Sequence, residues 1–272
     1  MSRPPAGIPP PTGGSSGLEL TAVLGPVRAQ NAFEETVERL LTVIKLGVVA
    51  PGERFPAERE LAALLGVSRI TLREAIRALQ LAGYVESRRG RFGGTFVIAT
   101  PPAPSRAELR RIAVEDADKI NDALTFRLAV ESGAAQVLAQ RVRTGRGSGL
   151  GAERRSGGSG GAPPGVDTVL PARLAAVNQA GPGDYRRMDT LFHLSLAELT
   201  GSTLLAAACA DARMRLNDLL NAIPVLQRNI DHTAAQHGAI VAAILDGDPA
   251  RAQQAVAEHL DGTAALLRGF LE

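Results

Sequence analysis

Apolar residues recur at helical spacing along most of this chain. In residues 32–46 they stand three and four positions apart, which predicts an amphipathic helix with one buried face, formed by Phe33, Val37, Leu40, Leu41 and Ile44. Gly47 ends that segment. The same spacing returns in residues 122–141, 185–199, 203–221, 231–245 and 249–271. The pattern predicts a mainly α-helical protein whose C-terminal half is an all-helical bundle.

Residues 51–98 carry a different succession of signals. After a Pro-Gly turn, Pro56 can open a second helix, because the first helical position needs no N–H. Gly66 permits a sharp turn, and Ser68 can cap a third helix by accepting a hydrogen bond from the amide of Ile70 or Thr71. That helix ends at Gly83; residues 84–88 and 95–98 then alternate as strands around a glycine-rich turn at 89–94. This succession predicts a winged helix-turn-helix.

The third helix has one apolar and one basic face. Leu72, Ala75, Ile76 and Leu79 point inward, whereas Arg69, Arg73 and Arg77 follow one another at intervals of four on a different face. Between residues 69 and 91, six arginines stand against two acids, although the net charge of the whole chain is only +2. Such an excess is expected of a phosphate-binding surface.

A basic helix of this kind fits the major groove of DNA. Arg69 and Thr71, near its N-terminus, are best placed for base edges. The ribbon tip, with Arg88, Arg89 and Arg91, can follow the phosphate backbone or enter the minor groove. The plainer alternative is a solvated surface on an ordinary helical hairpin, but the turn, the cap, the arginine spacing and the basic wing together favour DNA.

The amino-acid composition excludes several other classes of protein. Aromatic residues make up 3% of the chain and Trp is absent, which disfavours stacking platforms for single-stranded nucleic acid. The single cysteine, Cys209, rules out an intrachain disulfide framework and lies in an alanine-rich run, where a buried inert thiol is expected. No window approaches the roughly 18 apolar residues of a membrane span, and no signal-peptide anatomy is present. We expect a cytoplasmic protein without a membrane partner.

Proline- and glycine-rich stretches divide the chain. Residues 1–28 cannot bury enough surface to offset their ordering entropy and are expected to form a disordered tail. Residues 101–107 form a proline-rich linker between a winged-helix domain at 29–100 and a helical domain at 108–272. Within the second domain, residues 144–165 are expected to form a disordered glycine-rich loop.

All four histidines fall in the helical half. Asp189 and His193 are one turn apart on one helix face and can chelate one ion. His237 and His259 lie on two further helices, so a bundle can gather three imidazoles and one carboxylate around a divalent transition metal. His232 lies about 140° around a helix from His237 and is not expected to be a ligand. Spacing alone leaves open the alternative of ordinary surface or hydrogen-bonded core histidines.

The segment PGERFPAERELAALLGVSRITLREAIRALQLAGYVESRRGRFGGTFV resembles the DNA-binding domain of the GntR superfamily of bacterial transcription regulators. The resemblance implies that a group of residues on the second helix, the third helix and the wing contacts the operator: Arg59, Ser68, Arg69, Ile70, Thr71, Arg73, Arg89 and Gly90. Ile70 stands where other members often carry a small polar residue.

The helical half resembles the FCD effector domain of the FadR subgroup of that superfamily. The subgroup's metal-binding members carry D-x-x-x-H, a His that opens an H-x-x-I-x-x-A-I helix before G-D, and a further His about three turns later. Four residues fall on those positions and are implied to bind zinc, nickel or manganese: Asp189, His193, His237 and His259. Arg127 matches an arginine that often faces the effector and can hold a carboxylate; the alternative is a one-turn ion pair with Glu131. The glycine-rich loop stands where the family usually continues a helix.

These features predict a ligand-responsive transcription regulator. In the main hypothesis it is a repressor that binds a palindromic double-stranded operator as a homodimer and responds to a small carboxylate at the metal. A second hypothesis is a metal-dependent hydrolase, because a metal with open coordination positions can activate water. A third is a helical interaction protein whose basic head binds nucleic acid without specificity. No convincing general base accompanies the predicted ligands, so we expect no enzymatic activity.

Overall fold

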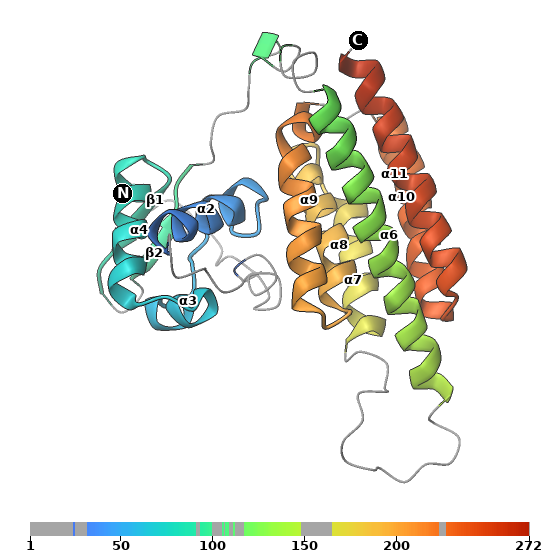
Figure 1. Cartoon of the computed structure of the whole chain (residues 1–272), viewed down its shortest axis with the longest axis horizontal. Helices are drawn as coiled ribbons and strands as arrows, with labels where there is room; N and C mark the ends of the chain where they lie inside the picture. The colour runs from blue at the N-terminus through green and yellow to red at the C-terminus, as the bar shows by residue number, and fades with distance from the viewer. Residues whose placement is uncertain are drawn as a thin grey trace, which may run out of the picture.

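The computed structural model describes residues 32–90, 93–99, 117–147, 165–222 and 227–271, together with Leu24, Ser105, Ala107, Glu108 and Arg111. Figure 1 shows two bodies side by side, a small head of helices with a two-stranded ribbon and a larger helical bundle. Apart from Leu24, the tail expected over residues 1–28 lies outside the described residues, and so does most of the linker expected over 101–107.

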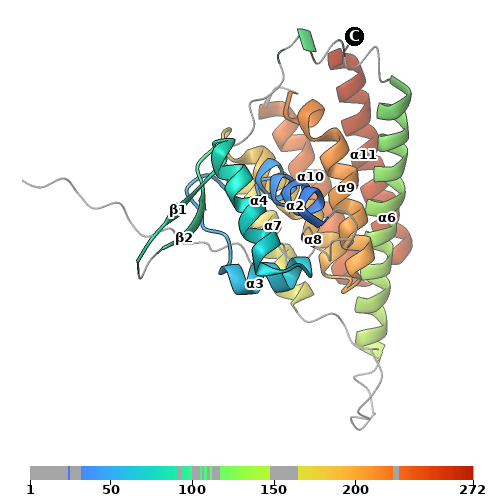
Figure 2. The ribbon, with the colours of Figure 1, turned by 60° about the vertical axis from the view of Figure 1, so that its left-hand side comes forward.

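The head is a winged helix-turn-helix, as predicted. Helices α2 (Ala32–Lys45), α3 (Glu58–Leu65) and α4 (Arg69–Leu81) precede the antiparallel strands β1 (Val85–Arg88) and β2 (Gly94–Val97). In the ribbon, Val85 pairs with Val97 and Arg88 with Gly94. Figure 2 shows the ribbon projecting away from the bundle, beside α4.

The expected local signals form the turn between α3 and α4. Gly66 ends α3 with a φ of +65°, a left-handed conformation that glycine adopts without a Cβ clash. Ser68 caps α4, because its Oγ accepts a hydrogen bond from Thr71 N at 3.0 Å. Helix α3 begins at Glu58 and not at Pro56, since the preceding chain stays extended where Phe55 N donates to Thr95 O at 2.9 Å.

The bundle contains α6 (Ala117–Gly147), α7 (Val166–Gln179), α8 (Tyr185–Glu198), α9 (Thr203–Ala222), α10 (Gln227–Asp246) and α11 (Pro249–Leu271). Its largest apolar cluster joins α6, α7, α8, α10 and α11 through residues such as Leu138, Leu170, Phe192, Ile240 and Val256. Each of the five helices expected from apolar spacing is present, and the mainly α-helical fold is confirmed.

Two features of the bundle add to or differ from the sequence-based expectation. Helix α7 is not among the helices expected by residue range, since Pro171 lies inside it and it buries only Val166, Leu170 and Val177, so its apolar pattern is sparse. Helix α6 continues to Gly147, so residues 144–147 are helical and do not begin the glycine-rich loop. Residues 148–164 of that loop lie outside the described residues.

The head and the bundle share a buried apolar core. Leu191 and Leu194 of α8 and Ala210 of α9 belong to the same cluster as Ile44 and Leu46 of the head. Helix α8 therefore packs against the head as well as against its neighbours in the bundle.

Two expectations from composition concern the helices themselves. Cys209 is buried among small residues of α6, α8 and α9, and this burial raises the pKa of its thiol, as expected of an inert cysteine. Within the described part of the chain, no helix combines the length and apolar character that crossing a membrane requires.

Candidate DNA-binding surface and metal centre

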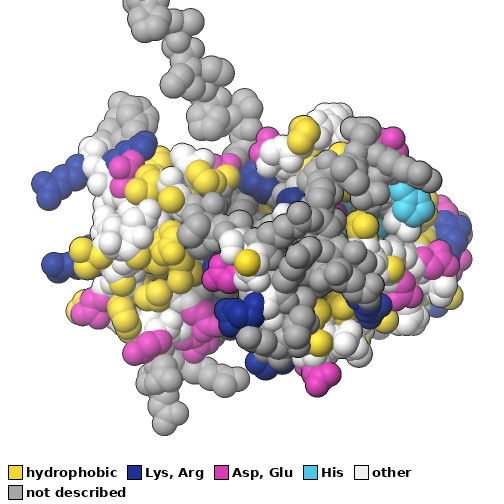
Figure 3. Space-filling model, turned by 90° about the horizontal axis from the view of Figure 1, so that it is seen from above, with side chains coloured by type: hydrophobic (Ala, Val, Ile, Leu, Met, Phe, Trp, Pro, Cys, Tyr) yellow, Lys and Arg dark blue, Asp and Glu magenta, His cyan; other side chains and the backbone are white. Residues whose placement is uncertain are grey.

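All eight residues expected to contact an operator lie in the described head, and only Thr71 is half-buried, the others being exposed. Ile70, at the start of α4, is 71% exposed, so a large apolar side chain faces outward there. Figure 3 shows Lys and Arg side chains projecting at the edge of the molecule where the head lies. The head thus presents the first turn of α4 to solvent.

An acid on α3 holds two of the candidate DNA-contacting arginines. Arg73 Nε donates to Glu58 Oε2 at 2.8 Å, and Arg69 Nη2 lies 3.8 Å from the same oxygen. All three side chains remain more than one-third exposed. The ion pairs therefore orient the arginines at low energetic cost, and phosphate or a base edge can replace Glu58.

Arg88 and Arg89 of the wing have different surroundings. Arg88 is held within the ribbon, because its Nε donates to Glu86 Oε1 at 2.6 Å and its guanidinium lies 4.3 Å from the centre of the Phe96 ring. Arg89 and Gly90, at the tip, are exposed, and Gly90 adopts a φ of +102° that favours glycine. Arg91, also expected at the tip, lies outside the described residues.

Asp189, His193, His237 and His259 come together in the interior of the bundle. Each offers one ligand atom, and these atoms lie within 4.8 Å of one another. Nε2 of His193 is 3.1 Å from Nε2 of His259, while Oδ1 of Asp189 is 3.8 Å from His193 Nε2 and 3.6 Å from His237 Nε2. These atoms converge on one point, whereas His232 is exposed and outside the group.

Hydrogen bonds on the far side of two rings set their orientation. His193 Nδ1 lies 2.7 Å from Glu131 Oε2, and His259 Nδ1 lies 3.1 Å from Gln236 Oε1. An acceptor at Nδ1 places the ring proton there and leaves the Nε2 lone pair for a ligand. The two facing lone pairs of His193 and His259 repel each other unless a cation or a proton lies between them.

His237 provides a direct test of whether an ion fits. The residue is fully buried, yet neither of its ring nitrogens has a hydrogen-bond partner within the described parts of the chain. Buried polar atoms are normally paired, and a metal ion at the convergence point would supply the missing partner for Nε2. The donor set of three imidazoles and one carboxylate suits a divalent transition metal.

The electrostatics of the centre favour the forms that ligate. Burial lowers the pKa of all three histidines, for His237 to about 3, so their rings are neutral at physiological pH. Burial alone would raise the pKa of Asp189, but the neighbouring histidines and Arg213 hold it below its usual range. The carboxylate is therefore ionised.

Arg213 orients this carboxylate. Its Nη2 donates to Asp189 Oδ2 at 2.9 Å and to Thr190 Oγ1 at 3.1 Å, which leaves Oδ1 directed at the histidines. Arg213 is 3% exposed, and its Nη1 lies 3.8 Å from Glu131 Oε1, although Nε and Nη1 make no hydrogen bond to a described residue. The centre thus contains a buried cation paired with two carboxylates.

Arg127 forms the ion pair that was the alternative to effector binding. It is 3% exposed, and its Nε donates to Glu131 Oε1 at 2.9 Å. It also lines a small cavity of about 90 Å³ between α6 and α11, together with Leu124, Leu260 and Arg268. Arg127 therefore pairs with Glu131 and lines a cavity at the same time.

Sequence reasoning missed Arg213 and Gln236 and gave Glu131 only its pairing with Arg127. That pairing could be read from the one-turn spacing, but the contact of Glu131 with His193 joins residues 62 positions apart. The available signal for Arg213 was a charged residue at a buried position in the apolar pattern of residues 203–221.

Comparison with known proteins identifies both parts of the chain. The family model described as "Bacterial regulatory proteins, gntR family" matches residues 33–97, and the model described as "FCD domain" matches residues 167–262. RmpR, named as an HTH-type transcriptional regulator of Mycobacterium gastri, is 30% identical over 241 residues, which cover 82% of this chain and 76% of RmpR.

Two further similarities extend over most of the chain. The Uxu operon transcriptional regulator of Escherichia coli K12 is 27% identical over 252 residues, or 89% of each chain. The solved structure of E. coli McbR/YncC is 19% identical with a TM-score of 0.46, and the match covers 88% of this chain and 98% of that one. The two family models and the named transcription regulators do not support the alternative of a metal-dependent hydrolase.

Proposed function

Since the chain belongs to the GntR family of bacterial transcription regulators, with a DNA-binding helix-turn-helix and an FCD domain, we propose that it is a dimeric repressor controlled by a metal ion and a small carboxylate. In this proposal residues 29–100 bind a palindromic operator, and residues 108–272 bind the effector and form the dimer. Zinc, nickel or manganese is held by four ligands: Asp189, His193, His237 and His259.

The observation that carries the proposal is that the two faces of α8 have different partners. At about 100° per residue, Arg187, Leu191 and Leu194 lie within an arc of about 60°, and this arc contacts the head. Asp189 and His193 lie on an arc centred about 150° away, and this arc faces the other metal-ligating candidates. A shift of α8 at the metal centre therefore also moves the surface on which the head rests.

The surroundings of the centre favour an anionic effector. A bound ion acts as a Lewis acid that can hold an oxygen ligand in an open coordination position. Arg213 adds a buried cation whose Nη1 lies 3.8 Å from Glu131 Oε1, and Arg127 lines the small cavity between α6 and α11. We propose that the effector carboxylate binds the metal and that Arg127 contributes to holding it. Differential affinity for two arrangements of α8 would then change operator binding.

An apolar face on α6 and α9 supports the dimer. Phe126 and Val137 are 36% and 40% exposed on α6, and Leu204 on α9 is 84% exposed. Between the two α6 residues, Gly133 leaves open space where a side chain would project. Figure 1 shows α6 and α9 side by side on one surface of the bundle. Such a face can be covered by the same face of a second copy.

The dimer face has a direct test in solution. Leu204→Glu places a charge on the exposed apolar surface and should shift sedimentation velocity from dimer to monomer at micromolar concentration. Glu60→Gln, at an exposed polar position on α3, serves as the control. A dimer that resists Leu204→Glu combined with Val137→Glu would place the interface elsewhere.

Replacing one histidine at a time tests whether the four candidate ligands bind a metal ion. Purified wild-type protein should contain about one divalent ion per chain by elemental analysis, and His193→Ala should lose it because a ligand and its Glu131 contact both disappear. His232→Ala, which removes an exposed histidine of α10, should retain the ion. Equal metal content in the two variants would contradict the four-ligand site.

The DNA claim is tested on the region upstream of the chain's own gene. A labelled duplex from that region should form a complex that Arg69→Ala and Arg73→Ala each weaken, relative to an equally long random duplex. Adding back metal and candidate carboxylates should change the affinity of wild-type protein but not of His193→Ala. Equal affinity for both duplexes would instead favour a nonspecific nucleic-acid binder.

A further inference from the structure

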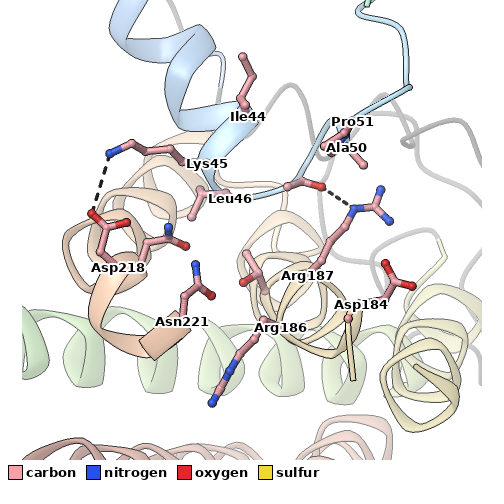
Figure 4. A pocket seen from close by; sticks show the side chains of 14 residues that line it. Ile44, Lys45, Leu46, Ala50, Pro51, Asp184, Arg186, Arg187, Asp218 and Asn221 are labelled. Carbon is pink, nitrogen blue, oxygen red and sulfur yellow. Dashed lines mark hydrogen bonds and ion pairs between the residues drawn. The ribbon is translucent and has the colours of Figure 1, made fainter. Parts of the chain in front are cut away.

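A second cavity lies between the head and the bundle. It has a volume of about 560 Å³, within the range of small-molecule sites. Ile44, Leu46 and Pro51 line it from the head, and Thr190, Asn217 and Asn221 line it from α8 and α9. Figure 4 shows these two walls facing each other across the boundary between the bodies. None of the four candidate metal ligands lines this cavity.

The charges around this interdomain cavity are balanced. Lys45 Nζ lies 4.0 Å from Asp218 Oδ2, and Arg187 Nη2 lies 3.2 Å from Glu53 Oε2. The remaining lining charges are one base and one acid: Arg186, whose guanidinium points away from the head in Figure 4, and Asp184. A ligand with a net charge would have to break one of these pairs, whereas an uncharged ligand leaves them intact.

Two amides give the cavity unused hydrogen-bonding capacity. Asn217 is only 9% exposed, and neither it nor Asn221 makes a side-chain hydrogen bond with a residue that the structure describes. Figure 4 shows the amide of Asn221 directed into the cavity toward Leu46. Each amide offers two donors and one acceptor. Asn221 is exposed at the cavity wall, whereas Asn217 is largely buried, and a buried amide normally has a partner.

We propose that the interdomain cavity binds a small uncharged polyhydroxylated molecule, of the class of monosaccharides and cyclic polyols. Its hydroxyl groups pair with the amides of Asn217 and Asn221, which can donate and accept. Its C–H surface lies against Leu46 and Pro51 of the head. This ligand is distinct in site and in charge from the carboxylate proposed for the metal centre.

Occupancy of the cavity has a structural consequence for regulation. The ligand touches both bodies, so it stabilises the arrangement in which the head rests on α8 and α9. The cavity also meets the metal centre through one side chain: Thr190 accepts from Arg213 Nη2 at 3.1 Å, and the same nitrogen donates to Asp189 Oδ2 at 2.9 Å. The two ligands therefore bias neighbouring contacts of one helix.

The test is calorimetric titration of the metal-loaded full chain, without DNA, so that its outcome does not depend on operator binding. The probes are a panel of neutral monosaccharides and inositols, with the matching sugar acids as charged comparators. At least one neutral member should bind with a Kd below about 1 mM. Asn221→Ala should weaken it about tenfold, and Asn178→Ala, at an exposed position of α7, should leave it unchanged.

Further variants distinguish a neutral ligand in this cavity from a charged ligand and from a ligand bound at the metal centre. Lys45→Ala should change the affinity for the neutral ligand by less than about twofold, because breaking a partly exposed ion pair at 4.0 Å costs little. Binding of a sugar acid alone, abolished by Lys45→Ala, would overturn the ligand class. Loss of the neutral ligand in His193→Ala but not in Asn221→Ala would place it in the metal centre. No binding by any neutral member would overturn the proposal, and unchanged circular dichroism shows that each variant is folded.

Discussion

Arg187 is a polar side chain of α8 that contacts the head. Its Nε donates to Gly47 O at 2.7 Å, and its Nη2 lies 3.2 Å from Glu53 Oε2. Its aliphatic carbons pack so closely on Gly47 that an added Cβ there would lie 3.0 Å from Arg187 Cγ. Arg187→Ala removes these contacts and leaves Asp189 and His193 in place, so it separates the interdomain contact from the metal centre.

The free energy that Arg187→Ala removes from the contact between head and bundle can be worked out from these distances and exposures. A hydrogen bond from a charged donor contributes about 1.5–3 kcal/mol, and an ion pair whose two side chains are each 25% exposed adds about 0–1 kcal/mol. Water that replaces Arg187 at the Gly47 carbonyl offsets part of this sum. We expect Arg187→Ala to weaken the coupling between head and bundle by about 2 kcal/mol, or about 30-fold in an equilibrium constant.

Two assays measure this loss. The first is the ratio of operator affinities of metal-loaded and metal-free protein, which reports the coupling free energy between the two sites; in Arg187→Ala the ratio should move toward one. The second is calorimetric unfolding. A destabilisation of 1 kcal/mol lowers the melting temperature of a domain as small as the head by about 4–8 °C. In Arg187→Ala the melting temperature of the head should therefore be about 8–16 °C lower.

A control arginine distinguishes coupling from loss of charge. Arg251→Ala removes an exposed arginine and its ion pair with Asp246, at the junction of α10 and α11. It should change neither the affinity ratio nor the melting of the head. If Arg187→Ala behaves like Arg251→Ala in both assays, α8 does not transmit the state of the metal centre through this contact.

Three further substitutions have defined outcomes. Glu58→Gln should release Arg69 and Arg73 and raise affinity for random-sequence duplex about two- to fivefold at low salt, measured by fluorescence anisotropy over a salt series. Ser68→Ala removes the cap of α4 and should lower the free energy of unfolding by about 1 kcal/mol in urea titrations. Burial raises the pKa of Glu198 to about 7 from 4.5, so the folded state binds this proton more tightly than the unfolded state does. Stability should therefore fall, by at most about 3 kcal/mol, as pH rises from 4.5 to 7, and Glu198→Gln should flatten that change in thermal unfolding at pH 5 and 8.

The sequence predicts the head well because its signals are local. Ser68 caps the helix that begins at the next residue, and Gly66 forms the turn two residues before it. The basic face of α4 follows from spacing along a single helix. Helix α7 is the counterexample: Pro171 breaks the usual pattern and three buried apolar residues suffice, because neighbouring helices stabilise it. Tertiary packing overrides local propensity there.

The candidate metal centre is predictable from sequence only in part, because part of it depends on tertiary packing. Asp189 and His193 share a helix face, so their convergence follows from helical geometry. The orientation of the rings depends on Glu131 and Gln236, and the carboxylate is held by Arg213 from another helix. These partners are set by how the helices pack, which apolar periodicity does not specify.

Glu131 connects the proposed effector site to the metal centre. Its Oε1 accepts from Arg127 Nε at 2.9 Å, and its Oε2 lies 2.7 Å from His193 Nδ1, so one buried carboxylate links the candidate effector arginine to a candidate ligand. An effector carboxylate that competes for Arg127 weakens the electrostatic hold on Glu131, and Glu131 can then move only by changing its contact with His193. Because His193 and Leu194 are consecutive on α8, and Leu194 packs in the apolar cluster shared with the head, we expect a change in that contact to reach the DNA-binding helices.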